Sequence, residues 1–349
     1  MLELRPIVVD ANMVVLGGNM RLKACKAAGL KEVPIVIADN LTEEQQAEFI
    51  IKDNVGFGEW DWDLLANEWD EQLLQEWGLD LPFDNTPVLE AEEDDYEAPS
   101  EIKTDIVIGD LIEIGHHRLL CGDSTDSDAV ARLMDGQKAD MVFTDPPYGM
   151  SYKGKVFGKD GLENDGDGEW ESVLTGAVAN MLIYSENAVC ALCFSPSRLD
   201  RFFNCTSALD FKRILTIYKP NRMGYPWQGW ILTSEIIALF QNGSPKYIKS
   251  NFKHDVYTFD YSERPDKEVN HPTVKPLSIV ADVISKTEGN SVMDLFLGSG
   301  TTMVASHQLN RKCYGMELDP KYCQVIVDRM HKLDPALEIK INGKPYDKY

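Results

Sequence analysis

The sequence predicts an α/β protein with two domains, and three observations indicate this. Apolar runs of strand length alternate with helical segments over much of the chain. An acidic stretch without periodicity, residues 83–100, separates a front part from a back part. A strand, a glycine turn and a helix follow one another near the C-terminus. We therefore expect a small α+β domain over 1–82, an acidic linker over 83–100 and a larger α/β domain over 101–349.

The front domain combines short strands with two helices. Gly17 and Gly18 end a predicted hairpin, and Thr42 with Gln45 forms a capping box that opens a helix. The expected elements, in order, are a hairpin of Pro6–Val9 and Met13–Leu16, a helix over Leu22–Ala28, a strand over Val33–Ile37 and a helix from Thr42.

The turn Gly17-Gly18-x-x-Arg21 before a helix resembles that of ParB/sulfiredoxin-like domains, over residues 1–55. In that family the turn contacts a phosphate-bearing ligand. The family's leading strand and helix have no counterpart before Met1, so the resemblance implies a truncated domain. An accessory or docking module is the alternative to a nucleotide site.

The most informative stretch of the back domain is Asp145-Pro146-Pro147-Tyr148, which ends an apolar strand over Met141–Phe143. Two successive prolines allow neither a helix nor a β-ladder, so these groups are held rigidly at the C-terminal end of the strand. Ligands bind at that edge of open α/β sheets. A carboxylate, a fixed carbonyl and an aromatic ring suit a planar base that carries an exocyclic amino group.

A second motif follows a strand over Ser291–Asp294. Gly298 and Gly300 allow the backbone to approach a ligand closely, and the N-terminus of the next helix favours an anionic group. The following strand, Cys313–Met316, ends at Glu317, where a carboxylate can accept hydrogen bonds from ribose hydroxyls. The third glycine of the dinucleotide fingerprint is absent, which argues against NAD.

The chain between the two motifs supplies the remaining predicted elements. Ser151–Glu169, which is rich in glycine, is expected to form a mobile loop over the site. Lysines among aromatic residues in Ser244–Phe259 form a candidate DNA-contacting segment, with a solvated loop as the alternative. The expected regular elements are a helix over Val173–Tyr184, strands over Val189–Phe194, Ile214–Tyr218 and Glu235–Phe240, and helices after Pro276 and over Met303–Leu309.

Together, the Asp-Pro-Pro-Tyr motif and the sequence Phe296-x-Gly298-x-Gly300 followed by Glu317 resemble the DNA amino-methyltransferases. The catalytic motif precedes the cofactor motif, as in the circularly permuted (β-type) class, and the resemblance covers roughly 101–332. It implies a Rossmann-like methyltransferase domain that uses S-adenosylmethionine and acts on double-stranded DNA. The implied catalytic residues are Asp145, Pro146, Pro147 and Tyr148; the implied cofactor residues are Asp123, Thr273, Lys275, Asp294, Phe296, Gly298, Gly300, Thr301, Thr302 and Glu317; the candidate DNA contacts are Lys246, Lys249 and Lys253.

The expected reaction is site-specific methylation of adenine N6. Asp145 and the Pro146 carbonyl would accept hydrogen bonds from the amino group, and Tyr148 would stack on a base flipped out of the duplex. Methylation at cytosine C5 would need a cysteine nucleophile, usually after proline, and no cysteine here follows a proline. Cytosine N4 remains the close alternative, although Asp before Pro-Pro-Tyr favours adenine by resemblance. A non-catalytic ParB-like DNA-binding module is the alternative from another class.

Composition limits the remaining expectations. The net charge is −23, but the acidity lies mainly at the front, because residues 83–100 carry 7 acidic and no basic side chains. Seven scattered cysteines indicate reduced thiols and a cytoplasmic protein, and no metal site is expected. No apolar run approaches the roughly 18 residues of a membrane span. The resemblance leaves open a homodimer and a restriction enzyme as partner, which the residues do not identify.

Overall fold

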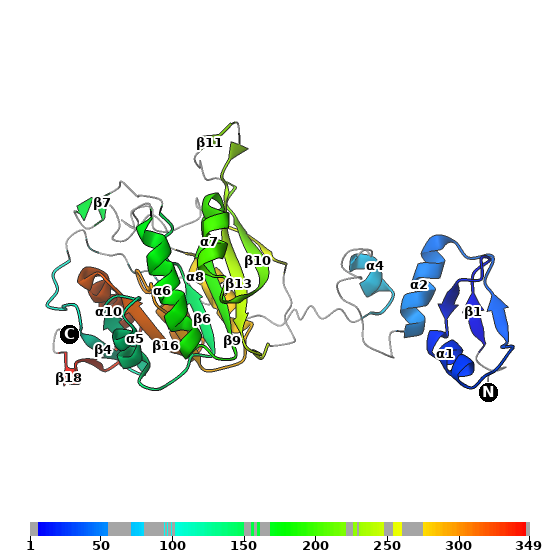
Figure 1. The fold of residues 1–349 in the computed structure, drawn as a ribbon, viewed down its shortest axis with the longest axis horizontal. Coiled ribbons are helices and arrows are strands. Elements are labelled where there is room, and N and C mark those ends of the chain that lie inside the picture. Colours follow the sequence, from blue (N-terminus) through cyan, green and yellow to red (C-terminus); the bar gives the residue numbers. More distant parts are fainter. Residues whose placement is uncertain are drawn as a thin grey trace. The chain divides into compact units, whose positions relative to one another are not determined.

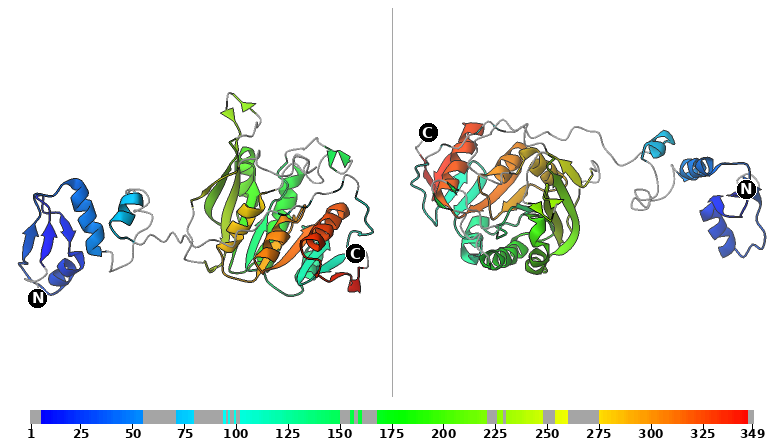
Figure 2. Two further views of the ribbon diagram at one scale, coloured as in Figure 1. Left: turned by 180° about the vertical axis from the view of Figure 1, so that it is seen from behind. Right: turned by 90° about the horizontal axis from the view of Figure 1, so that it is seen from above.

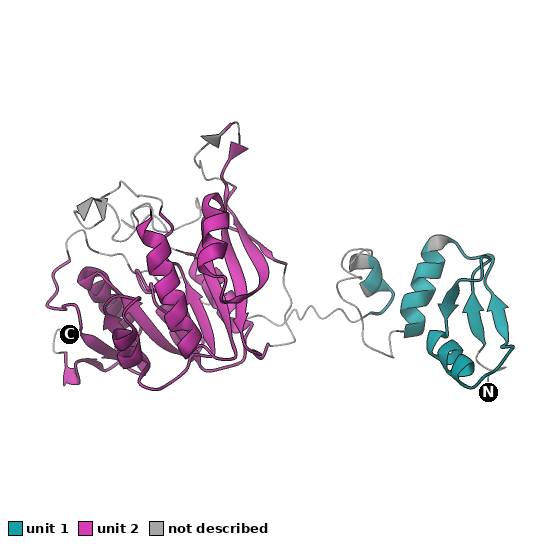
Figure 3. Cartoon of the chain, viewed as in Figure 1, with its two compact units in different colours: residues 1–85 teal, residues 86–349 magenta. Residues whose placement is uncertain are grey.

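The computed structural model of the protein describes residues 6–54, 71–79, 94, 96, 99, 102–149, 155–156, 159–160, 168–220, 226–228, 230–247, 254–259 and 275–346. These residues belong to two compact units, 1–85 and 86–349 (Figure 3). Within the described ranges, no helix has the length and apolar character needed to cross a bilayer.

The first unit contains a three-stranded sheet in the order β2-β1-β3. The predicted hairpin is confirmed, since β1 and β2 pair antiparallel, while β3 pairs parallel with β1. The capping box is also confirmed: Thr42 N donates to Gln45 Oε1 at 3.0 Å, and Gln45 N donates to Thr42 Oγ1 at 3.3 Å. The elements are β1 (Ile7–Val9), β2 (Val15–Gly17), α1 (Asn19–Ala27), β3 (Ile35–Ile37), α2 (Glu43–Asn54) and α4 (Glu71–Glu76).

The second unit is built on an eleven-stranded sheet in the order β14-β10-β13-β9-β6-β15-β16-β5-β4-β17-β18 (Figure 1). The five neighbours from β9 to β5 are parallel, and β13 runs antiparallel between β9 and β10. The strands of this sheet are β4 (Leu111–Ile114), β5 (His117–Cys121), β6 (Met141–Thr144), β9 (Ala188–Phe194), β10 (Asp210–Tyr218), β13 (Ser234–Asn242), β14 (Val256–Thr258), β15 (Ser291–Asp294), β16 (Lys312–Glu317), β17 (Ile339–Ile341) and β18 (Lys344–Pro345).

Helices cover both faces of this sheet (Figure 2). The helices are α5 (Ser127–Met134), α6 (Glu169–Tyr184), α7 (Leu199–Cys205) after a short 3₁₀ turn (Pro196–Arg198), α8 (Leu277–Ser285), α9 (Thr301–Gln308) and α10 (Pro320–Leu333). Two short hairpins complete the unit: β7 (Lys155–Val156) with β8 (Lys159–Asp160), and β11 (Pro226–Trp227) with β12 (Trp230–Ile231).

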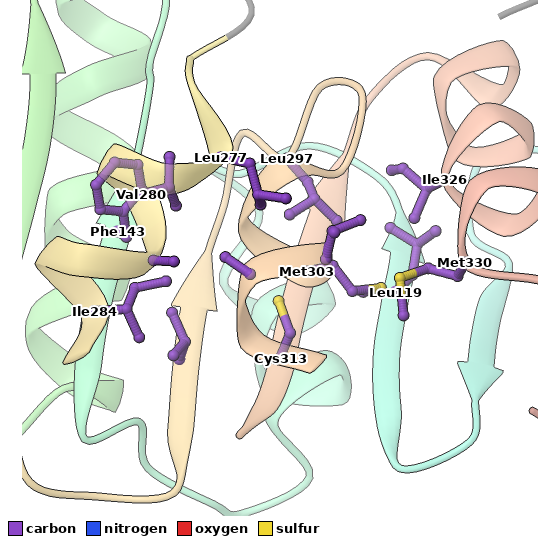
Figure 4. Close-up of a cluster of buried hydrophobic side chains, with 14 of the residues drawn as sticks. Leu119, Phe143, Leu277, Val280, Ile284, Leu297, Met303, Cys313, Ile326 and Met330 are labelled. Carbon is purple, nitrogen blue, oxygen red and sulfur yellow. The ribbon is translucent and has the colours of Figure 1, made fainter. Parts of the chain in front are cut away.

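Two apolar cores fill the space between sheet and helices. One packs the sheet against α8, α9 and α10 (Figure 4), and the other packs its opposite face against α5, α6 and α7. Successive residues of β6 alternate between them, because Met141 and Phe143 belong to the first core and Val142 to the second. This alternation is the two-residue period of a strand buried on both faces.

The strands and helices predicted for the back domain are present, with ends that differ by a few residues. The sequence analysis did not predict several elements, among them α5, α10 and the antiparallel edge β4-β17-β18. The helix α10 carried a usable signal, because Asp319 caps it through Lys321 N at 2.8 Å and Pro320 opens it. The predicted mobile loop Ser151–Glu169 falls mostly outside the described residues.

Candidate active site

The two sequence motifs meet where the chain changes direction across the sheet. β6 and β15 are parallel neighbours, with Val292 opposite Met141 and Met293 opposite Val142. From β6 the chain continues through α6 to β9 on one side, and from β15 it continues through α9 to β16 on the other. Ligands of open α/β sheets bind outside the carboxyl ends of the strands at such a switch point. We call this edge the catalytic edge.

A buried hydrogen bond fastens the two strand ends together. Thr144, the last residue of β6, donates from Oγ1 to Oδ1 of Asp294, the last residue of β15, at 2.6 Å. The same oxygen accepts from Phe296 N at 3.0 Å, which turns the chain toward the glycines. Burial raises the pKa of Asp294 to about 6, although the hydrogen bond from Thr144 opposes this rise. Asp294 therefore has a structural role in joining the motifs.

Both carboxylate oxygens of Asp145 already have partners. Tyr148 donates from its hydroxyl to Oδ1 at 3.0 Å, and Lys275 donates from Nζ to Oδ2 at 2.6 Å. Burial, and then the charge of Asp145, raise the pKa of Tyr148 well above its usual value, so its hydroxyl keeps its proton. The Asp145 side chain retains 23% exposure, so a further donor can reach it.

Lys275 is held in place by two carboxylates. Its ammonium group lies 2.6 Å from Asp145 Oδ2 and 3.5 Å from Glu235 Oε2, with only 6% of the side chain exposed. Burial, the largest single influence, disfavours the charged form of Lys275. The charge of Asp145, together with the neighbouring acidic groups Tyr148, Glu235 and Cys193, opposes burial, and the pKa of Lys275 is raised well above its usual value. The sequence analysis assigned Lys275 to the cofactor. The structure places its ammonium group against the Asp145 carboxylate, and its cofactor contact stays a prediction. Thr273 lies outside the described residues.

A close packing contact locks the end of the catalytic motif. Gly149 has φ of +68°, and a Cβ atom there would lie 2.4 Å from Cδ1 of Trp170, which is fully buried in α6. Arg198 donates to the Gly149 carbonyl at 3.2 Å. Glycine is therefore required after Tyr148, and Trp170 of α6 together with Arg198 of the 3₁₀ turn before α7 fixes the backbone there. The sequence analysis missed this role, although a glycine directly after the motif was visible.

The predicted cofactor turn is organised by Glu317. Its carboxylate accepts from Gly298 N at 2.8 Å and from Asp319 N at 2.9 Å. Burial raises the pKa of Glu317 to about 7, despite these two backbone hydrogen bonds. Gly300 has φ of +91° and is the N-cap of α9, where a Cβ atom would lie 3.0 Å from Ile326 Cγ1. Thr301 and Thr302 are buried in the first turn of that helix.

The loop after β5 and Arg329 of α10 also contact the region of the cofactor turn. Gly122 N donates to the Glu317 carbonyl at 2.9 Å, so the predicted Asp123 lies at the catalytic edge. Arg329 donates to the Ser299 carbonyl at 3.0 Å, and it also pairs through two nitrogens with Asp94, at 2.5 and 3.1 Å. Sequence reasoning missed Arg329, and it placed Asp94 in a solvated linker.

Of the candidate DNA lysines, the described one, Lys246, does not lie at the catalytic edge. Lys246 is exposed, and its carbonyl accepts from Glu288 N, just before the start of β15. That is the opposite edge of the sheet from Asp145, because β15 begins there and ends at the site. The structure thus gives no support to a DNA contact at Lys246, and Lys249 and Lys253 lie outside the described residues.

Comparison with known proteins agrees with this arrangement. A family model described as DNA methylase (N6_N4_Mtase) matches residues 139–328. The chain is 25% identical over 235 residues to the type II methyltransferase M2.MboI of Moraxella bovis. This alignment covers 59% of this chain and 85% of that protein. The chain is also 25% identical over 266 residues to the type II methyltransferase M.HinfI of Haemophilus influenzae. That alignment covers 60% of this chain and 70% of the relative.

Among solved structures, the M1.HpyAVI–SAM complex aligns with a TM-score of 0.47 and 18% identity, covering 61% of this chain and 98% of that chain. The family match includes both the catalytic motif and the cofactor turn and spans more than half of the 349 residues. This chain therefore belongs to the N6/N4 DNA methylase family.

Proposed function

We propose that the protein methylates the exocyclic N6 amino group of adenine at specific sites in double-stranded DNA. The observation that carries this proposal is the juxtaposition of Asp145 with the Gly298–Gly300 turn across the β6–β15 pair. Membership of the family makes the protein a DNA methyltransferase and implies S-adenosylmethionine as the methyl donor. Adenine, rather than cytosine N4, is favoured by the aspartate before Pro146-Pro147-Tyr148.

The catalytic motif would activate the amino nitrogen, whose lone pair is delocalised into the ring. Asp145 and the Pro146 carbonyl accept hydrogen bonds from the two N–H groups, which increases the electron density on nitrogen. The carboxylate then stabilises the positive charge that develops on nitrogen during transfer. Tyr148 stacks on the base, which must leave the duplex because the helix encloses its reactive atom.

The residues at the cofactor turn fit S-adenosylmethionine, which supplies the methyl group when bound. Gly298 and Gly300 have φ of +54° and +91° and carry no side chain, so the backbone of the turn can approach a ligand closely. The N-terminus of α9 suits the carboxylate of the amino acid part. Glu317 is fixed by two backbone N–H groups and retains lone pairs for ribose hydroxyls. These residues orient the donor beside Asp145, so proximity supplies much of the rate.

Two finer assignments belong to the same proposal. The β-type permutation is supported by the order of the chain, in which β6, followed by the Asp145 motif, precedes β15, followed by the Gly298–Gly300 turn. A ParB-like origin of the first unit is supported by Gly18, which caps α1 at φ of +89° with the Arg21 side chain against it. We infer an accessory role for that unit in choosing or holding the DNA.

The test is direct identification of the product. Purified protein is incubated with unmethylated duplex DNA and S-adenosylmethionine, and the DNA is digested to nucleosides for mass spectrometry. N6-methyladenine is the expected product, and sequencing that detects modified bases then gives the recognition site. N4-methylcytosine would support the cytosine alternative instead. Unmodified DNA, from protein that binds S-adenosylhomocysteine and DNA, would contradict the proposal.

A further inference from the structure

A line of alternating charges extends from the catalytic carboxylate into the protein. Asp145 contacts Lys275, Lys275 contacts Oε2 of Glu235, and Oε1 of Glu235 contacts the ammonium group of Lys219. The line begins at a partly exposed carboxylate and ends at a fully buried ammonium group: the side chains of Asp145, Lys275, Glu235 and Lys219 are 23%, 6%, 14% and 0% exposed. The innermost charge is thus fully removed from water.

Strand pairing fixes the inner two residues. Glu235 is the second residue of β13 and lies opposite Ile217 of β10. Lys219 directly follows β10, and its backbone N donates to the Thr233 carbonyl at 2.8 Å. Both side chains therefore start from the rigid β10–β13 pair, at the catalytic edge. Lys275 approaches them from the segment that leads into α8.

Burying this pair is costly, and stability alone does not account for it. An ion pair that is removed from water often contributes no more than well-packed apolar residues of similar volume would. A methionine and a leucine could fill these positions without a desolvation penalty. The charges therefore have a more specific consequence, which is their effect on Lys275.

Resting on the proposed function, we propose that Lys219 and Glu235 are positioning residues that set how strongly Lys275 holds the Asp145 carboxylate. Lys219 occupies one oxygen of Glu235, so Glu235 attracts Lys275 only moderately. Lys275 remains close to Asp145, at 2.6 Å, and farther from Glu235, at 3.5 Å. This balance fixes the orientation of Asp145 while leaving it enough negative charge to stabilise the amino nitrogen.

The balance predicts opposite effects for the two partners. In Glu235→Gln, Lys275 has lost a competing anion and neutralises Asp145 more fully. In Lys219→Met, Glu235 has lost a cation and draws Lys275 away from Asp145. A nearby cation favours the ionised carboxylate, so the acid limb of the pH profile for methyl transfer moves to lower pH in Glu235→Gln and to higher pH in Lys219→Met. Among the described residues, Tyr148, Cys193 and Asp294 are further titratable groups near this line, and all three remain in both variants.

The double variant Lys219→Met/Glu235→Gln gives a second criterion. Since Lys219 influences Lys275 through Glu235, the double variant should have the same acid limb as Glu235→Gln. Each single variant should lower the single-turnover rate constant by about 10–100-fold, the size of loss seen when a residue that orients a functional group is replaced. Lys212→Met is the matched control, because Lys212 lies at the far end of β10 and is partly exposed.

The experiment measures single-turnover methyl transfer to duplex DNA at saturating S-adenosylmethionine across the pH range, with S-adenosylhomocysteine affinity by calorimetry. The inference requires that the acid limb shifts in opposite directions in the two single variants. It also requires that the double variant has the same acid limb as Glu235→Gln and that cofactor affinity is unchanged. Shifts in the same direction, additive losses or unchanged profiles would overturn it. If Lys219→Met does not fold, two milder variants still test the inference. Glu235→Gln is nearly isosteric and should shift the acid limb to lower pH, whereas the conservative Lys219→Arg should behave like wild type. Wild-type protein that transfers no methyl group would refute the proposed function instead.

Discussion

Replacing Glu317 with glutamine is expected to remove a pH dependence from cofactor binding. The carboxylate is buried at the end of β16 and accepts from Gly298 N and Asp319 N. Because burial raises its pKa to about 7, Glu317 changes protonation close to neutral pH. Ribose hydroxyls donate best to the ionised carboxylate, so the ionised protein is the form that binds. Affinity for S-adenosylhomocysteine should therefore increase with pH.

The pKa sets the size of this effect. The ionised fraction of Glu317 is about one tenth at pH ~6 and about nine tenths at pH ~8, and apparent affinity scales with the competent fraction. Wild-type affinity should thus rise about tenfold between these values, which is about 1.4 kcal/mol. Hydrogen bonds to a charged group contribute about 1.5–3 kcal/mol, so Glu317→Gln should weaken binding about 10–100-fold at the higher pH and abolish the slope.

Folding stability should change in the opposite direction. The folded-state pKa of Glu317 lies above that of an unfolded glutamate, so its stabilisation is present at low pH and lost as pH rises through about 7. Without cofactor at high pH, Glu317→Gln should therefore unfold at a higher temperature than wild type. A variant that binds cofactor less well while melting later is not explained by general damage to the fold.

The assay is calorimetric titration with S-adenosylhomocysteine at several pH values, combined with thermal unfolding. Buffers of different ionisation enthalpy report the protons released when cofactor binds near neutral pH. Glu288→Gln is the matched control, because Glu288 is exposed before the start of β15, at the opposite edge of the sheet. A flat wild-type profile, or a Glu317→Gln profile like that of wild type, would refute the assignment of Glu317 to the cofactor.

Three further predictions address the rest of the site. Asp145→Asn should lower kcat by about 10²–10³ while the S-adenosylhomocysteine dissociation constant stays nearly constant, because a charge aimed at the transition state is lost; normal turnover would sink the catalytic assignment. Gly300→Val should reduce both cofactor affinity and melting temperature, because its φ of +91° is strained for a β-branched residue, and wild-type titrations would exclude the turn from the site. A chain that begins at Thr86 should bind cofactor normally, whereas one that begins after Asp94 should bind less tightly because Arg329 loses its partner beside the turn; equal affinities would show that this pair is dispensable.

The sequence predicted the parts of the site that depend on local geometry. Strand β6 was visible as an apolar run stopped by Pro146, and the turn after β15 as glycines ahead of a helix. Such features follow from backbone restrictions that a few neighbouring residues impose. Their proximity in space could be inferred because parallel strands share one carboxyl edge.

The sequence could not predict contacts that depend on residues far apart in the chain. Asp145 and Lys275 are separated by 130 positions, and nothing local indicates that they pair. Lys219 and Glu235 resemble solvated residues at strand ends, because a charged side chain in a loop is usually exposed. Arg329 lies on α10, where an arginine is an ordinary surface residue until the helix is packed beside the glycine turn.

These long-range contacts explain how the site is assembled before any ligand binds. Thr144 ties the end of β6 to Asp294, Glu317 holds Gly298, and Lys275 holds Asp145. Each contact joins a different strand or segment, so the catalytic carboxylate and the cofactor turn cannot move independently. Chemistry that depends on placing a methyl donor in line with a weak nucleophile gains most from such fixed geometry. The buried charges carry a desolvation cost, and in return they hold the Asp145 carboxylate in one orientation, which an apolar core at the same positions could not do.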